Sequence, residues 1–286
     1  MYFAGLFLQM TIIKDIQITG SEQKPMLTDI FYTGKTEGKD AVIYAHGFNG
    51  FKDWGNFDLI AKQFAEAGLV FVKFNFSHNG TTASKPEEFA DLEAYGNNNY
   101  TKELNDLGTV IDWVVDATPG LKKIFLLGHS RGGGIALLKA AEDSRVNGVV
   151  TWASVSECKT PWSGWSLEQI EEWEEKGVQY YTNARTKQEM PLYYQLYKNY
   201  LQNQLRLNIE RAIKSLEIPV LICHGSADPA VPVQKAYELR AWQPEAQLFI
   251  VESDHVFGRK HPWEEEYLPD AMQQVVDKSI QFLKGA

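Results

Sequence analysis

The chain is poor in cysteine, in basic charge and in metal-binding motifs. Only two of its 286 residues are cysteines, Cys158 and Cys223, so it has no disulfide framework. Neither a Cys-x-x-Cys pair nor a His-Glu-x-x-His pattern is present, so no metal is implied. The 37 acidic residues outnumber the 28 basic ones, and the formal charge of −9 argues against binding to nucleic acid or to an anionic membrane.

The apolar runs are also short. None approaches the roughly 20 residues of a membrane span. The first ten residues are apolar but lack a basic region and a small-residue cleavage site, and Met10 is an alternative start to Met1. With so few cysteines, we expect a cytoplasmic protein. The sequence leaves the oligomeric state open.

Strand-like runs alternate with helical periodicity over most of the chain. This alternation predicts an α/β fold with a mostly parallel sheet and helices on both faces. No helical pattern separates the first two runs, which predicts an antiparallel hairpin at one edge. The expected strands are residues 11–19, 27–33, 41–46, 70–76, 123–128, 147–153, 218–223 and 247–251.

The alternation breaks between residues 155 and 210, a stretch too long for an ordinary connection. We predict an α/β core over 1–154 and 211–286 and a helical cap insertion over 155–210. The insertion is rich in aromatic residues, most of which we expect to pack the cap on the core. A few are expected to line a substrate pocket, and the candidates are Trp162, Trp165, Tyr193 and Tyr197.

A candidate nucleophile lies in residues 128–132, which read Gly-His-Ser-Arg-Gly. The apolar run before them and the small-residue run after them predict a strand, a sharp turn and a helix, with Ser130 at the apex. Side chains at the two glycine positions would collide with the neighbouring strand and helix. A glycine-rich turn that only packs, or that holds a phosphate, is the alternative, but neither phosphate-loop spacing is present.

A serine hydroxyl needs a base, and the base needs an orienting carboxylate. Asp228 follows the strand-like run 218–223, and His255 follows the run 247–251. The order Ser130, Asp228, His255 is typical of the strand–turn–helix nucleophile arrangement. Glu252 and Asp254 are alternative acids, and Asp228 could instead open a turn or cap a helix.

Two backbone N–H groups are candidates for binding an oxyanion. Arg131 opens the helix after the nucleophile, and Phe48 follows the strand-like run 41–45 in the segment His-Gly-Phe-Asn-Gly, residues 46–50. Gly47 lets the backbone turn sharply. Three further histidines, His46, His129 and His224, lie at predicted strand ends and are expected to form hydrogen bonds around the site.

Four features follow one another along the chain: the segment 46–50, the segment 128–132, Asp228 and His255. With these features in this order, the chain resembles the α/β-hydrolase fold serine hydrolases. Residues 46–50 and 72–80 resemble the corresponding loops of cinnamoyl and feruloyl-type carboxylesterases and of serine peptidase-like hydrolases. The resemblance implies a serine esterase that acts on a small-molecule ester through an acyl-enzyme and needs no cofactor. An aminopeptidase, thioesterase or acyltransferase with the same triad, or a ligand-binding protein without activity, are the alternatives.

Overall fold

The computed structural model describes residues 9–286. The apolar start of the chain, on which the choice between Met1 and Met10 depends, lies outside the described residues except for its last two positions. Within residues 9–286, no helix combines the length and the apolar character that a membrane crossing needs.

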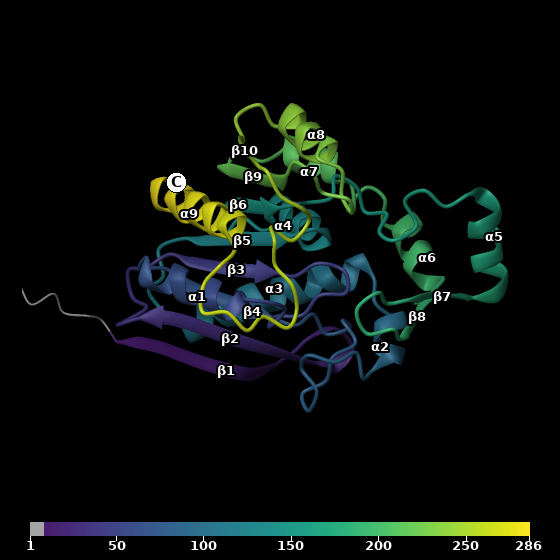
Figure 1. The fold of residues 1–286 in the computed structure, drawn as a ribbon, viewed down its shortest axis with the longest axis horizontal. Coiled ribbons are helices and arrows are strands. Elements are labelled where there is room, and N and C mark those ends of the chain that lie inside the picture. Colours follow the sequence, from purple (N-terminus) through teal and green to yellow (C-terminus); the bar gives the residue numbers. More distant parts are fainter. Residues whose placement is uncertain (1–8) are drawn as a thin grey trace, which may run out of the picture.

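One eight-stranded sheet forms the centre of the molecule (Figure 1). Its spatial order is β1-β2-β4-β3-β5-β6-β9-β10, and the last six strands of this order run parallel. β1 and β2 form an antiparallel hairpin at one edge, as predicted. The strands are β1 (Met10–Thr19), β2 (Pro25–Thr33), β3 (Ala41–Ala45), β4 (Val70–Phe74), β5 (Ile124–His129), β6 (Val146–Trp152), β9 (Val220–Gly225) and β10 (Gln247–Val251).

The central strands are apolar throughout because helices cover both faces of the sheet. All five residues of β3 are buried, and successive side chains contribute to opposite cores. Ile43 packs into the core under α3, α4, α7 and α8, and Val42 and Tyr44 pack into the core under α1 and α9. The helices are α1 (Phe57–Glu66), α2 (Leu92–Gly96), α3 (Tyr100–Ala117), α4 (Arg131–Glu142), α7 (Ile209–Lys214), α8 (Gln234–Trp242) and α9 (Asp270–Gly285).

The segment between β6 and α7 forms a lobe beside the sheet (Figure 1). It contains α5 (Leu167–Lys176), α6 (Gln195–Gln202) and an antiparallel hairpin of β7 (Val178–Thr182) and β8 (Glu189–Tyr193). The predicted cap helices are thus present, and the β7–β8 hairpin is an addition that the sequence did not reveal. The limits 155–210 of the cap stay a prediction.

The loops that carry the predicted site residues all leave the same end of the sheet. Parallel strands place their carboxyl ends at one edge, where open α/β sheets build their sites. The loops after β3, β5, β9 and β10 carry Phe48, Ser130, Asp228 and His255 respectively. The fold thus brings together residues that lie up to 207 positions apart in the sequence (Phe48 to His255, 255 − 48).

Candidate active site

Ser130 lies at the apex of a strained turn between β5 and α4. Its backbone has φ 55° and ψ −121°, a conformation that a residue with a side chain rarely adopts. A Cβ on Gly128 would lie 2.2 Å from the carbonyl oxygen of Gly132, and one on Gly132 would lie 2.2 Å from that of Ala45. The turn is therefore possible only with glycine at both positions, and its tightness presents Ser130 at the end of the sheet.

Asp228 and His255 form a hydrogen-bonded pair. His255 Nδ1 lies 2.7 Å from Asp228 Oδ2. The other carboxylate oxygen, Oδ1, accepts hydrogen bonds from the backbone N–H groups of Ala230 and Val231, both at 2.8 Å. The carboxylate of Asp228 is thus fixed by its own loop and directed at the imidazole.

The environment of Asp228 keeps it ionised. Burial alone would raise the pKa of Asp228, but hydrogen bonds from His224 and His255 lower it well below its usual range. His224 Nε2 lies 3.2 Å from Asp228 Oδ2 and donates to the carbonyl oxygen of Val231 at 2.8 Å. An ionised Asp228 can hold the imidazole of His255 in one tautomer and stabilise its cationic form.

The alternative acid Asp254 has a different task. Its Oδ1 accepts hydrogen bonds from the backbone N–H groups of Val256 and Gly258, at 3.1 and 2.9 Å. Asp254 is exposed and shapes the loop after β10. Glu252, the other alternative, is also exposed, and neither forms an ion pair with His255 within residues 9–286.

Ser130 and His255 line one cavity of about 250 Å³. No hydrogen bond joins the Ser130 hydroxyl to His255 in the part of the chain that the structure describes. Such contacts are often long in enzymes without substrate and tighten in the complex. His129 Nε2 donates to the backbone carbonyl of His255 at 2.9 Å, so the two loops are tied together.

Of the two predicted oxyanion donors, Phe48 lines this cavity and Arg131 directly follows Ser130, which also lines it. Arg131 is the first residue of α4, so its backbone N–H has no acceptor inside the helix. Phe48 lines the cavity and belongs to the turn that the Gly50 N–H closes on the carbonyl of Gly47 at 3.0 Å. The oxyanion hole itself stays a prediction.

Two networks hold the Phe48 loop. Burial lowers the pKa of His46 to about 4, so this histidine is neutral; its Nδ1 lies 2.9 Å from the carbonyl of Gly47. Its Nε2 accepts from the backbone N–H of Phe76 at 3.2 Å. On the other side, Asn49 Oδ1 accepts from the hydroxyls of Tyr95 and Tyr181, both at 2.5 Å.

Tyr181 belongs to β7, so the cap contacts the predicted oxyanion loop directly. The sequence analysis missed Asn49, Tyr95 and Tyr181. The one signal was the place of Asn49 beside Phe48, where a left-handed conformation, here φ 58°, suits asparagine. The hydrogen bonds of His46, His129 and His224 confirm the expectation for these three residues.

The side chain of Arg131 is buried and packs behind the turn that carries Ser130. Its Nε donates to Glu103 at 2.9 Å, and its guanidinium lies 3.9 Å from the ring centroid of Tyr100. It is not among the residues that line the cavity. Only the backbone of Arg131 is therefore a candidate for the chemistry.

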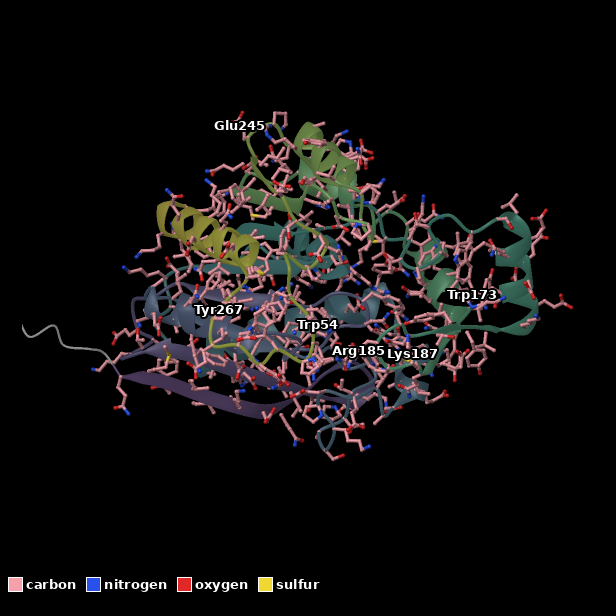
Figure 2. The ribbon with its side chains drawn as sticks, in the orientation of Figure 1. Trp54, Trp173, Arg185, Lys187, Glu245 and Tyr267 are labelled. Atoms are coloured by element: carbon pink, nitrogen blue, oxygen red, sulfur yellow. The ribbon has the colours of Figure 1, made fainter. Side chains whose placement is uncertain are left out.

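The cavity has aromatic walls and two arginines. The cap contributes the turn between β7 and β8, with Asn183, Ala184 and Arg185. Figure 2 shows Arg185 close to Trp54, which comes from the loop after β3. The remaining lining residues are Tyr44, His46, Gly47, Phe48, Asn49, Gly50, Phe51, Phe57, His129, Val256 and Arg259.

None of the four predicted pocket aromatics lines this cavity, so the structure corrects that assignment. Trp162 packs against Tyr197 at 5.8 Å between ring centroids, and Trp165 packs against Trp173 at 5.1 Å. Figure 2 shows Trp173 inside the lobe, away from Trp54. The aromatics build the cap's own core because a small lobe needs large side chains to bury area.

Tyr193, the fourth of these residues, points to the outside. Its hydroxyl donates to Glu93 at 2.5 Å, and its ring covers Gly96, where a Cβ would lie 2.9 Å from a ring carbon. Tyr193 therefore attaches β8 to α2. The cap reaches the cavity through the β7–β8 turn instead, which the sequence analysis assigned to no element.

One group of carboxylates has a spacing that a metal ion could use. Asp29, Asp53 and Asp58 place one oxygen each within 4.8 Å of one another. The ammonium groups of Lys52 and Lys73 already lie among these oxygens, as in the pair of Lys52 with Asp29 at 2.8 Å. The two lysines supply the positive charge that a cation would bring.

The comparisons with known proteins concern the family and the fold of the chain. Residues 36–206, more than half of the chain, match the family model described as serine aminopeptidase, S33. No curated protein matches the chain.

Solved structures resemble almost the whole chain at low sequence identity. Est1E from Butyrivibrio proteoclasticus has a TM-score of 0.66 and 16% identity over 96% of this chain and 98% of its own. The esterase domain of a Rhodothermus marinus protein has a TM-score of 0.64 and 14% identity, over 97% and 99%. The Pyrococcus furiosus esterase Pf2001 has a TM-score of 0.60 and 15% identity, over 97% and 93%.

These structures share the α/β-hydrolase fold, with its mostly parallel sheet and its helices on both faces. On the family model and this fold, the chain belongs to the S33 serine aminopeptidase family of α/β-hydrolases and is a hydrolase.

Proposed function

We propose that this hydrolase cleaves carboxylic esters with Ser130 as nucleophile, His255 as base and Asp228 as the orienting acid. The observation that carries the proposal is the Asp228–His255 pair, 2.7 Å apart, whose imidazole lines the same cavity as the strained Ser130. The esterase neighbours support the same class of reaction. One of them, Est1E, has also been solved with ferulic acid bound.

The reaction follows from this arrangement. Ser130 Oγ attacks the ester carbonyl while Nε2 of His255 takes its proton. The backbone N–H groups of Phe48 and Arg131 stabilise the negative oxygen of the tetrahedral intermediate. His255 then protonates the leaving alcohol, and a water molecule, activated by the same imidazole, releases the acid from the acyl-enzyme.

The cavity favours esters over the substrates of an aminopeptidase. An aminopeptidase has to bind a protonated amine, for which a carboxylate is the usual partner. No acidic side chain is among the described residues that line the cavity, whereas Arg185 and Arg259 are. These arginines would repel a cationic amino terminus. The name of the family is therefore not sufficient reason to propose aminopeptidase activity for this chain.

The test is labelling with a fluorophosphonate, followed by a substrate panel. The wild-type protein should label and Ser130→Ala should not, because only an activated serine reacts. The panel contains 4-nitrophenyl acetate and butyrate, methyl hydroxycinnamates, amino-acid 4-nitroanilides and an acyl thioester. Labelling that persists in Ser130→Ala, or turnover of the anilides alone, would contradict the proposal.

A further inference from the structure

Arg259 is a buried cation that faces the catalytic cavity. It lies four residues after His255, is 4% exposed and lines the same cavity as Ser130 and His255. The reaction proposed above does not use its side chain. A charged group in this position therefore needs its own explanation.

The guanidinium has no carboxylate partner. Within residues 9–286, no carboxylate oxygen lies within 4.0 Å of it. Its Nε donates to the carbonyl of Val256 at 2.8 Å, and its Nη1 is buried without any hydrogen-bond partner. An unpaired buried charge is costly, and native structures rarely keep one without a use.

The groups around Arg259 do not neutralise it. Tyr44 and Asp254 are the groups that favour its charge, but Tyr44 is a neutral phenol and Asp254 is exposed beyond ion-pair distance. The other titratable groups that line the cavity are His46, His129, Arg185 and His255, and none of them is an anion. Burial lowers the pKa of Arg259 to about 10, which leaves it cationic at neutral pH.

Two aromatic rings hold the guanidinium in place. Its Cζ lies 4.7 Å from the ring centroid of Phe57 and 5.6 Å from that of Trp54. Such contacts offset part of the cost of burying the charge but accept no hydrogen bond in the plane of the guanidinium. The arrangement fixes Arg259 and leaves donors free, which is the state expected of a site for a flat anion.

We propose that the substrate is an ester that carries a carboxylate on its acyl chain and that Arg259 binds this carboxylate. This inference rests on the proposed ester hydrolysis, whose substrate class it names. The acyl chain between the two ends would lie against the aromatic walls formed by Phe48, Phe51 and Trp54. Arg185 lies at the exposed side of the cavity and attracts the anion at longer range.

The first experiment compares two esters of the same shape on the wild-type protein. Monomethyl glutarate carries the carboxylate, and methyl 5-methylhexanoate has an isopropyl group in its place. Hydrolysis is followed by titration of the released acid. The kcat/KM of the glutarate should exceed that of the neutral ester by at least about tenfold, because a charged hydrogen bond is gained. Equal or better cleavage of the neutral ester would overturn the inference.

The second experiment identifies the residue. Arg259→Gln should lower the glutarate-to-neutral ratio of kcat/KM by about 10–100-fold, and Arg259→Lys should keep part of it. Arg185→Gln is the matched control, since it removes a cation from the same cavity and should change the ratio by less than about threefold. An equal loss in both glutamine variants would assign the effect to the general charge of the cavity and not to Arg259.

A binding measurement separates this inference from the proposed function. Glutarate itself should raise the Tm of the wild-type protein and not that of Arg259→Gln. If fluorophosphonate labelling and all ester turnover fail while glutarate still stabilises the wild type, the ester proposal is wrong and the anion site stands. If neutral esters are cleaved but glutarate neither stabilises nor competes, the anion site is wrong and the esterase stands.

Discussion

Two regions of this protein bury positive charge, and they do so in opposite ways. Lys52 and Lys73, at most 1% exposed, each contact three carboxylates, with Asp29 and Asp53 shared between them. Arg259 is almost as buried and contacts no carboxylate of residues 9–286. Lys73 belongs to β4 and Lys52 contacts it through Asp29 of β2, whereas the arginine lines the cavity that holds Ser130 and His255. A paired buried charge fixes the fold, whereas an unpaired one beside a nucleophile indicates a ligand.

The same contrast applies to the negative charges. Asp29 is wholly buried between the two ammonium groups and has no access to the cavity. Asp228 is also buried, but the Nδ1 it binds belongs to an imidazole that faces the cavity. Substitutions in the two regions should therefore separate stability from activity.

The largest effect is expected on the catalytic side. Asp228→Asn should lower kcat by roughly 10³–10⁴-fold with little change in stability, because the amide favours the wrong tautomer of His255. Asp254→Asn is the matched control from the same site and should keep kcat within about threefold. Ester kinetics measure both. A large loss in Asp254→Asn, with Asp228→Asn unaffected, would exchange the two assignments.

Lys73 and Arg259 should also differ in how much each contributes to the stability of the fold. Lys73→Met should lower the free energy of unfolding by about 3–5 kcal/mol, because it removes one of the two cations beside the buried Asp29. Arg259→Met leaves no carboxylate without its cationic partner, so it should change that free energy by less than about 1 kcal/mol. Denaturant unfolding measures both. A loss of the same size in Arg259→Met would make Arg259 a structural residue and erase the contrast.

Much of this organisation could be predicted from the sequence, because it is local. All eight strands of the main sheet were expected within a few residues, since the apolar runs of the six parallel strands alternate with helical patterns and the first two runs have none between them. Ser130, Asp228 and His255 follow from motifs at strand ends. The cap hairpin was missed because β8 contains Pro191 and no residue of β7 is fully buried, so neither has the apolar run of a buried strand.

The charge pairing could not be predicted, because it depends on contacts distant in the sequence. Lys73 meets Asp29 only after β2 and β4 pair, 44 residues apart in sequence (73 − 29). In the sequence, Arg259 and Lys73 are two ordinary basic residues. Whether a buried cation has a partner is decided by the packing of several elements, and so is the choice of which aromatics line a cavity.

Acid should remove the stability that the ion pairs of Lys52 and Lys73 with Asp53 give to the fold. Burial would raise the pKa of Asp53, but Lys73 and Lys52 lower it to about 2. A carboxyl whose folded pKa lies below the unfolded value of about 3.9 stabilises the fold above that value, and the effect is lost as pH falls towards 2. The difference in unfolding free energy between wild type and Asp53→Asn should therefore shrink by on the order of 1–2 kcal/mol between pH 5 and pH 2.

Urea titrations over this range measure that difference for both proteins. Arg259→Met provides the control, because its difference from wild type involves no such carboxyl and should not follow the same acid profile. A difference between wild type and Asp53→Asn that stays constant down to pH 2 would show that the lysines do not hold Asp53 ionised.

The smallest effect concerns how the cap acts on the catalytic side. Tyr181→Phe removes one of the two hydroxyls that bind Asn49 beside the predicted oxyanion donor Phe48. A neutral hydrogen bond contributes about 1 kcal/mol, so kcat should fall by roughly threefold to tenfold while KM changes little. Tyr193→Phe removes an exposed hydrogen bond to Glu93 in the same hairpin and is the matched control. It should leave kcat unchanged. Equal effects of the two variants would mean that the cap acts through its general stability and not through the contact of Tyr181 with the oxyanion loop.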